Sequence, residues 1–134
     1  TLLTKLVFQK LNIKNKEELI ERIYPKNPME IIPLLSILVE QASKKGDKVA
    51  KNILKSAGKE LAFSASAVIK KLNFQNKKFP LVLIGSMFKS KIILREVQRE
   101  IKNFVPKVEI ILPKVKPVAG AVKLAIEALE NGSN

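Results

Sequence analysis

The residues best suited to contact a ligand are a glycine and a serine that end a short apolar run. The run LVLI (residues 81–84) stops at Gly85 and Ser86, and a helix pattern starts at Ser90. Such a run predicts a buried strand of a parallel sheet. Open α/β sheets bind ligands where the carboxyl end of a strand turns into a helix. Since Gly and Ser have little bulk, a flat ligand such as an adenine ring could approach the backbone, although tight strand–helix packing favours the same residues.

The composition excludes several kinds of catalytic site. The chain has no His and no Cys, so a His-based triad and a His/Cys metal site are ruled out. Its only aspartate, Asp47, directly precedes a helix pattern, where a helix cap is a better interpretation than a catalytic base. We therefore expect no catalytic and no metal-binding residue here. If the protein is an enzyme, most of its reacting groups lie outside this chain.

The net charge of +13 raises the question of nucleic-acid binding. Only three of the 25 basic residues are arginine, the residue that leads in base readout, and the lysines are spread along the chain. No aromatic-rich sheet motif for stacking bases is present. We interpret the lysines as a solvated surface, so a nucleic-acid partner is not the favoured hypothesis.

The length and hydropathy of the chain point to a soluble domain. Its 134 residues suit one domain or one lobe of a larger protein. No apolar run approaches the roughly 18 residues that span a membrane, so we expect no membrane partner. The lack of Cys is typical of a reducing compartment, and we expect a cytoplasmic protein.

Hydrophobic periodicity predicts a helical block followed by strand, helix, strand and helix. The predicted helices cover about residues 1–11, 15–24, 28–45, 47–72, 90–104 and the segment from 117, and the predicted strands cover 81–84 and 108–112. Asn15 and Glu18 are placed to cap the second helix, which should end before Pro25. Small residues of the long helix, such as Gly58 and Ala62, predict close helix packing.

This order predicts an α/β fold, helix-rich with at least two parallel strands joined by a right-handed crossover. Residues 1–75 would form a helical part and residues 76–134 a βαβα nucleotide-binding part, together one compact unit. Two strands make a poor sheet, so we expect further strands before Thr1 and a chain that is a fragment of a longer protein.

Three blocks of the chain resemble one protein family. ASKKGDKVA (residues 42–50), followed by IL and AGKEL (57–61), resembles the pattern A-x-x-G-D-x-x-A…I-L…A-x-x-E-L. The strand and turn at residues 81–90 and the helix start PVAGA (117–121) resemble two further blocks. The pattern is that of N-acetylglucosamine kinases and related BadF/BadG/BcrA/BcrD-type ATPases, and the resemblance covers about residues 28–129.

The resemblance implies the actin-like ATPase superfamily, in which two ribonuclease-H-like lobes hold ATP in their cleft. This chain would be the carboxyl-terminal portion of the second lobe. The phosphate loops, magnesium carboxylates, sugar site and catalytic Asp of the family precede this segment, so Mg²⁺ would bind through the missing upstream part. The parent protein would be an ATP-dependent kinase of N-acetylglucosamine or a related amino sugar.

The resemblance also implies which residues contact the nucleotide. Gly85 and Ser86 would lie against the adenosine, with Met87 and Phe88 beside or beneath it. Ser90 would fix the turn by capping the following helix. For Phe88, a place in the hydrophobic core is the better interpretation of the residue itself.

Two further regions would complete the nucleotide site. Gly120 would keep the last helix close to the sheet under the nucleotide. The resemblance places the other wall of the adenine slot near Ile32 and Pro33, where we assign no residues.

Alternatives of other kinds stay open. Within the superfamily, the protein could be the ATPase that activates a dehydratase or reductase, although such activators carry iron–sulfur cysteines. Outside it, the chain could be a basic nucleic-acid-binding domain or a purely structural helical module. The expected partners are a nucleotide and, through the missing lobe, a sugar substrate; homodimer formation is left open.

Overall fold

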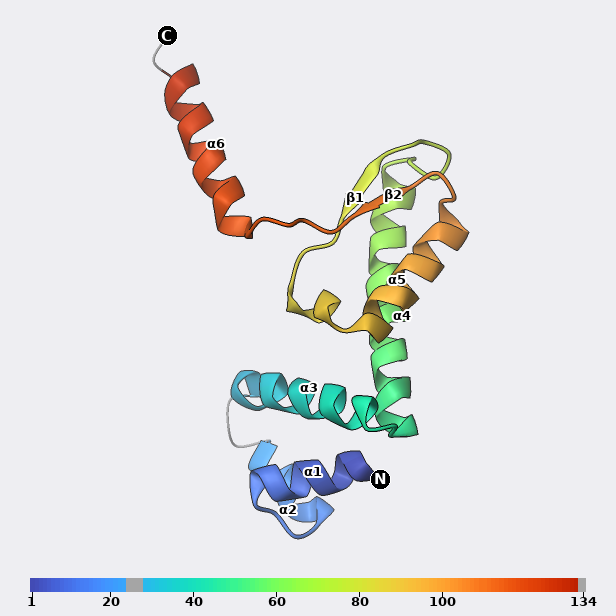
Figure 1. Cartoon of the computed structure of the whole chain (residues 1–134), viewed down its shortest axis with the longest axis vertical. Helices are drawn as coiled ribbons and strands as arrows, with labels where there is room; N and C mark the ends of the chain where they lie inside the picture. Colours follow the sequence, from blue (N-terminus) through green and yellow to red (C-terminus); the bar gives the residue numbers. More distant parts are fainter. Residues whose placement is uncertain (24–27, 133–134) are drawn as a thin grey trace.

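The computed structural model describes residues 1–23 and 28–132, which form helices beside a small two-stranded sheet (Figure 1). The elements are, in chain order, α1 (Leu2–Leu11), α2 (Lys16–Ile23), α3 (Pro28–Lys44), α4 (Lys48–Lys71), β1 (Pro80–Val82), the short 3-10 helix η1 (Ser86–Lys89), α5 (Lys91–Phe104), β2 (Glu109–Ile111) and α6 (Pro117–Asn131). The predicted order of elements is confirmed, and η1 is an addition that the sequence pattern did not predict.

A reciprocal cap starts α2, as the sequence predicted. The Asn15 side-chain oxygen accepts a hydrogen bond from the Glu18 backbone N–H at 2.8 Å, and the Glu18 carboxylate accepts one from the Lys14 N–H at 3.0 Å. These bonds satisfy N–H groups that have no partner within the helix. The helix ends at Ile23, and Pro25, the predicted terminator, lies outside the described residues.

The corner between α3 and α4 depends on Gly46 and Asp47. Gly46 has a φ of +95°, a backbone conformation that L side chains rarely adopt. The Asp47 carboxylate accepts hydrogen bonds from the N–H of Ala50 at 3.0 Å and of Leu3 at 2.8 Å. These donors favour the charged form and lower the pKa of Asp47 below its ordinary value of 3.8. Asp47 is therefore a helix cap, as predicted, and it also ties α1 to the start of α4.

Helices α4 and α5 cross where α4 carries a glycine. A Cβ added at Gly58 would lie 2.6 Å from the Glu96 Cβ and 3.1 Å from the Ile93 carbonyl oxygen. No side chain fits in that space, so the predicted close packing of the long helix is confirmed. The buried Glu96 carboxylate forms an ion pair with Arg99, one turn further along α5.

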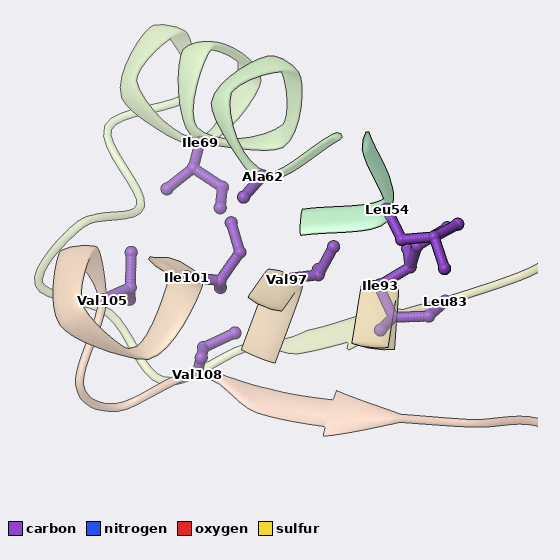
Figure 2. Packing of buried hydrophobic residues seen from close by; sticks show 9 residues of the cluster. All are labelled: Leu54, Ala62, Ile69, Leu83, Ile93, Val97, Ile101, Val105 and Val108. Carbon is purple, nitrogen blue, oxygen red and sulfur yellow. The ribbon is translucent and has the colours of Figure 1, made fainter. Parts of the chain in front are cut away.

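The hydrophobic core lies on both faces of α5 (Figure 2). Its buried cluster consists of Leu54, Ala62 and Ile69 from α4, Leu83 after β1, Ile93, Val97 and Ile101 from α5, and Val105 and Val108 before β2. Figure 2 shows α5 between α4 on one side and the strands on the other. The cluster draws residues from both sides of the predicted boundary at residue 75.

The two strands pair in parallel, as expected for strands joined by a helical crossover. Leu81 lies opposite Ile110 in the register, and the Leu83 N–H extends the pairing by donating to the Ile111 carbonyl at 2.9 Å. The helix-rich fold with two parallel strands is therefore confirmed.

The prediction that residues 81–84 form a buried strand is wrong in this structure. Leu83 is buried against α5, whereas Val82 and Ile84 are 46% and 58% exposed. Side chains alternate between the two faces of a strand, and helix α5 covers only one face of this sheet. The apolar run therefore leaves one hydrophobic sheet face open.

Helix α6 projects away from the other elements (Figure 1). It starts at Pro117 as predicted, but apolar side chains such as Val122 and Leu124 are 55% and 68% exposed. Apart from its chain neighbours and the nearby backbone of α6, no heavy atom in the described part of the chain lies within 4 Å of a Cβ built at Gly120. The expectation that Gly120 holds the last helix close to the sheet is therefore wrong here.

Across residues 1–23 and 28–132, the helices lack the combination of length and apolar character needed to cross a membrane.

Candidate functional site

The turn after β1 has an unusual backbone at Gly85. Its φ of +122° and ψ of 162° are accessible to glycine but strained for other residues. Apart from Gly85 itself and its two chain neighbours, no heavy atom of the described residues lies within 4 Å of the position that a Cβ would take. Gly85 therefore provides the turn geometry and leaves an open stretch of backbone at the carboxyl end of the strand.

Helix η1 follows directly and holds the other predicted site residues together. The Gly85 carbonyl accepts a hydrogen bond from the Phe88 N–H at 3.3 Å, and the Met87 carbonyl accepts one from the Ser90 N–H at 3.1 Å. Met87 is 42% exposed, whereas Phe88 is half-buried and packs against the core cluster. The interpretation of Phe88 as a core residue agrees with this packing.

A groove of about 460 Å³ lies between α3, α4 and η1; we call it the helix groove. Ser86, Met87 and Ser90 line it on one side. The opposite side is formed by the α3 residues Ser36, Ile37, Val39, Glu40, Gln41 and Lys44, and Ile53, Leu54 and Ala57 of α4 contribute apolar side chains. Its lining is mostly apolar with a few polar groups, which is typical of small-molecule sites.

The α3 residues that line the helix groove begin at Ser36. The resemblance placed the other wall of the adenine slot near Ile32 and Pro33, which do not line this groove. The sequence did carry a signal for the lining residues, because Ser36, Glu40 and Lys44 recur every four residues and therefore share one helix face. That polar stripe runs along a helix whose other residues are mostly apolar.

Two side-chain oxygen atoms in the helix groove have no hydrogen-bond partner among the described residues. Ser90 is 7% exposed, and its hydroxyl is one of these two atoms. The same holds for Oε2 of Glu40, while Oε1 of Glu40 lies 3.5 Å from the Lys44 ammonium. Ser90 occupies the N-cap position of α5 but makes no side-chain cap bond, so its expected capping role is wrong.

A second hollow of about 510 Å³ lies beyond the carboxyl ends of both strands; we call it the strand-end hollow. Gly85, Ser86 and Phe88 line it together with residues 112–116. Of the described residues that line it, Lys89, Lys114 and Lys116 are basic and none is acidic. The five predicted site residues thus separate two hollows, and Ser86 and Lys89 face both.

Within the described residues, no group of three or more carboxylates, histidines or cysteines could hold a metal ion.

Comparison with known proteins settles the family. A sequence model described as the BadF/BadG/BcrA/BcrD ATPase family matches residues 13–125. The chain belongs to the BadF/BadG/BcrA/BcrD ATPase family. The resemblance recognised in the three sequence blocks is thereby confirmed.

A curated relative of this ATPase-family chain is the N-acetylmuramic acid/N-acetylglucosamine kinase of Clostridium acetobutylicum. The two are 37% identical over 127 residues, which is 93% of this chain. The aligned part is 42% of the relative, so the chain spans less than half of that kinase. No solved structure matches the chain.

Proposed function

We propose that this chain forms the adenosine-binding part of an ATP-dependent sugar kinase. The observation that carries the proposal is the open backbone of Gly85, at the carboxyl end of β1 and beside the helix groove. Membership in an ATPase family and similarity to a sugar kinase support the same assignment.

In this proposal the base occupies the helix groove. Ser86 and Met87 lie on one side of the ring and the Ile37 side of α3 lies on the other. The apolar lining suits a flat heteroaromatic ring, which would bury much of its surface there. Met87 is exposed enough to contact the ring without moving the core.

The phosphates would leave the groove over Gly85, where no Cβ blocks their path. Lys89 faces both hollows, and Lys114 and Lys116 give the strand-end hollow a positive lining. Lysine ammonium groups are common partners of phosphate. The charge of this edge therefore fits an anionic nucleotide better than a neutral nucleoside.

The parent protein would transfer the γ-phosphoryl group of ATP to a hydroxyl of N-acetylglucosamine or a related amino sugar. The name of the relative supports this class of acceptor. Such transfer depends mainly on positioning and electrostatic stabilisation around Mg²⁺. In this proposal the Mg²⁺ and sugar ligands would belong to a part of the protein outside this chain.

We further propose that the fold is the distal part of a ribonuclease-H-like lobe. The exposed sheet face at Val82 and Ile84 would then pack against other parts of that lobe. A boundary between a helical part (1–75) and a nucleotide-binding part (76–134) fits the position of the Gly85 turn, although the helix groove also requires α3 and α4.

Calorimetric titration of the full chain with ATP tests the proposed function. We expect ATP to bind, and Gly85→Ala to weaken binding about tenfold, because the substitution strains the turn and places a Cβ at the open backbone. Gly120→Ala is the matched control, since Gly120 lies on the projecting helix α6. Failure of the wild-type chain to bind ATP, or equal affinities for wild type and Gly85→Ala, would contradict the proposal.

The 134 residues alone should not catalyse phosphoryl transfer. A coupled assay that detected sugar-dependent ATP turnover by this chain would contradict the placement of the reacting groups elsewhere.

A further inference from the structure

We infer that Glu40 and Ser90 are the specificity-determining pair of the helix groove, and that they hydrogen-bond the nucleoside part of the ligand. The inference rests on the proposed function and adds the two residues that would recognise polar groups of the nucleoside. Glu40 Oε2 would accept a hydrogen bond from an N–H or O–H of the nucleoside, and the Ser90 hydroxyl would donate one to a nucleoside acceptor.

The first argument is that both side chains have unused hydrogen-bonding capacity in the same groove. Ser90 Oγ and Glu40 Oε2 are buried without partners among the described residues, and both residues line the helix groove. Leaving a buried polar group unsatisfied costs about 1–3 kcal/mol, so native structures rarely keep one without a reason. A ligand that enters the groove would supply the missing partners.

The second argument is that two comparable buried side chains elsewhere in the described part of the chain do have partners. The buried Glu96 is paired with Arg99, and the buried Ser43 hydroxyl donates to the Glu40 backbone carbonyl at 2.8 Å. Lys44 engages Glu40 only through Oε1, at 3.5 Å, and its side chain is 72% exposed. Lys44 can therefore hold the Glu40 carboxylate in place while leaving Oε2 free for a ligand.

The third argument is chemical complementarity. An ionised carboxylate can only accept hydrogen bonds, whereas a serine hydroxyl can donate one. An adenine edge presents an amine donor beside a ring-nitrogen acceptor, and a ribose presents hydroxyls that both donate and accept. Either edge supplies the required donor to Glu40, so the experiment must separate the base from the ribose.

The experiment compares ATP, ITP and 2′-deoxy-ATP binding to the full chain by calorimetry, for wild type and Glu40→Gln. ITP replaces the amine of adenine with a carbonyl, and 2′-deoxy-ATP lacks one ribose hydroxyl. We expect the wild type to bind at least one analogue about 10- to 100-fold more weakly than ATP, as for loss of a hydrogen bond to a charged group. In Glu40→Gln that preference should shrink several-fold. The analogue that the wild type disfavours identifies the edge that Glu40 contacts.

The matched control for Glu40 is Glu127→Gln. Glu127 forms the same kind of i,i+4 ion pair, with Lys123 at 3.8 Å, but lies on α6. This variant should keep the nucleotide preference of the wild type. If Glu40→Gln also keeps it, the role assigned to Glu40 is wrong.

Ser90→Ala separates a ligand-binding role from a structural one. Because the Ser90 hydroxyl makes no hydrogen bond to the described residues, its removal should leave the melting temperature unchanged or raise it. Nucleotide affinity should nevertheless fall about fivefold, as for loss of a neutral hydrogen bond. The control is Ser64→Ala, whose exposed hydroxyl donates to the Glu60 carbonyl at 3.0 Å and which should not affect affinity.

The outcomes also separate this inference from the proposed function. If the wild-type chain binds no nucleotide, the proposed function fails and this inference fails with it. If the wild type binds ATP but Ser90→Ala melts at a lower temperature with unchanged affinity, Ser90 has only a structural role. That result would overturn the inference and leave the proposed function standing.

Discussion

The interface between α4 and α5 and the helix groove both use helix α4, yet their buried polar groups differ in whether they are paired. At the interface, Gly58 has no side chain, and this leaves room for Glu96. The Glu96 carboxylate is paired with Arg99. In the groove, Glu40 Oε2 and the Ser90 hydroxyl are buried without partners among the described residues. The buried carboxylate of the first region is paired, whereas two polar atoms of the second region have unused hydrogen-bonding capacity.

This difference separates residues that maintain the fold from residues that are available for binding. Fully packed positions of α5 tolerate little change, because protein interiors are as dense as organic crystals. Groove positions such as Met87 carry little of the packing energy, and their substitution should show mainly in ligand binding. The following changes test that separation, beginning with the largest expected effect.

Ile101→Ala should have the largest effect on stability. Ile101 is fully buried in the core cluster, so its truncation should lower the free energy of unfolding by about 3–4 kcal/mol through lost burial and a cavity. Urea denaturation measures the change. The control is Ile126→Ala on α6, where the side chain is 51% exposed and the loss should stay below about 1 kcal/mol. Similar losses for both variants would contradict the assignment of the core to α4, α5 and the sheet.

Gly58→Ala should have the next largest effect on the free energy of unfolding. The matched substitution Gly120→Ala should change the same quantity in the opposite direction. The added Cβ would meet Glu96 and the Ile93 carbonyl, so we expect a loss of about 1–2 kcal/mol after the gain in helix propensity. Gly120→Ala meets no neighbour and should stabilise α6 by about 0.5–1 kcal/mol. Thermal unfolding of both variants shows whether each substitution lowers or raises stability. If Gly58→Ala stabilised the protein, α4 and α5 could separate to admit the added Cβ, and the close packing at Gly58 would not be required.

Met87→Ala should affect binding more than folding. Met87 is 42% exposed on η1, so the free energy of unfolding should change by less than about 0.5 kcal/mol. If the base occupies the helix groove, ATP affinity should fall several-fold, because apolar contact with the ring is lost. If Met87→Ala lowered the free energy of unfolding without changing ATP affinity, Met87 would have a structural role in the core and no role in binding.

Asp47→Asn should show the smallest effect, and that effect should depend on pH. The pKa of Asp47 is lowered in the folded protein by the N–H donors of Ala50 and Leu3. A lowered folded-state pKa contributes stability above the ordinary value of 3.8, and this stability is lost as the pH falls below that value. The wild type should therefore be the more stable at pH 7, and its advantage should shrink in urea titrations at about pH 3 and below. An advantage that grew on acidification would contradict the capping role.

Local signals predicted the helices and the turn residues well. Asn15 and Glu18 cap α2 and Asp47 caps α4, as each residue's own chemistry indicated. These features depend on hydrogen bonds within a few residues of the chain. Such short-range interactions can be predicted from a single sequence because both partners are visible in the same window.

The same local reasoning failed wherever the answer depended on distant elements. The apolar run at residues 81–84 left Val82 and Ile84 exposed, and Gly120 lies on a helix that makes no close contact at that point. Ser90 stands at a cap position without making the cap bond. In each case the residue type was compatible with the predicted role, but the arrangement of the surrounding elements did not place the residue in that role.

The sequence by itself determined the family, the order of helices and strands, and the glycine turn at Gly85, because each depends on residue types at short spacing. Only the tertiary structure decided that residues Ser36 to Lys44 of α3 line a groove beside the turn. It also decided that Glu40 Oε2 and the Ser90 hydroxyl in this groove have no partner among the described residues. Glu40 and Ser90 are far apart in the chain, and only the packing of α3 and α4 against η1 and α5 brings them to the same groove. Whether a buried polar group is satisfied is therefore a property of the assembled fold and not of its local sequence.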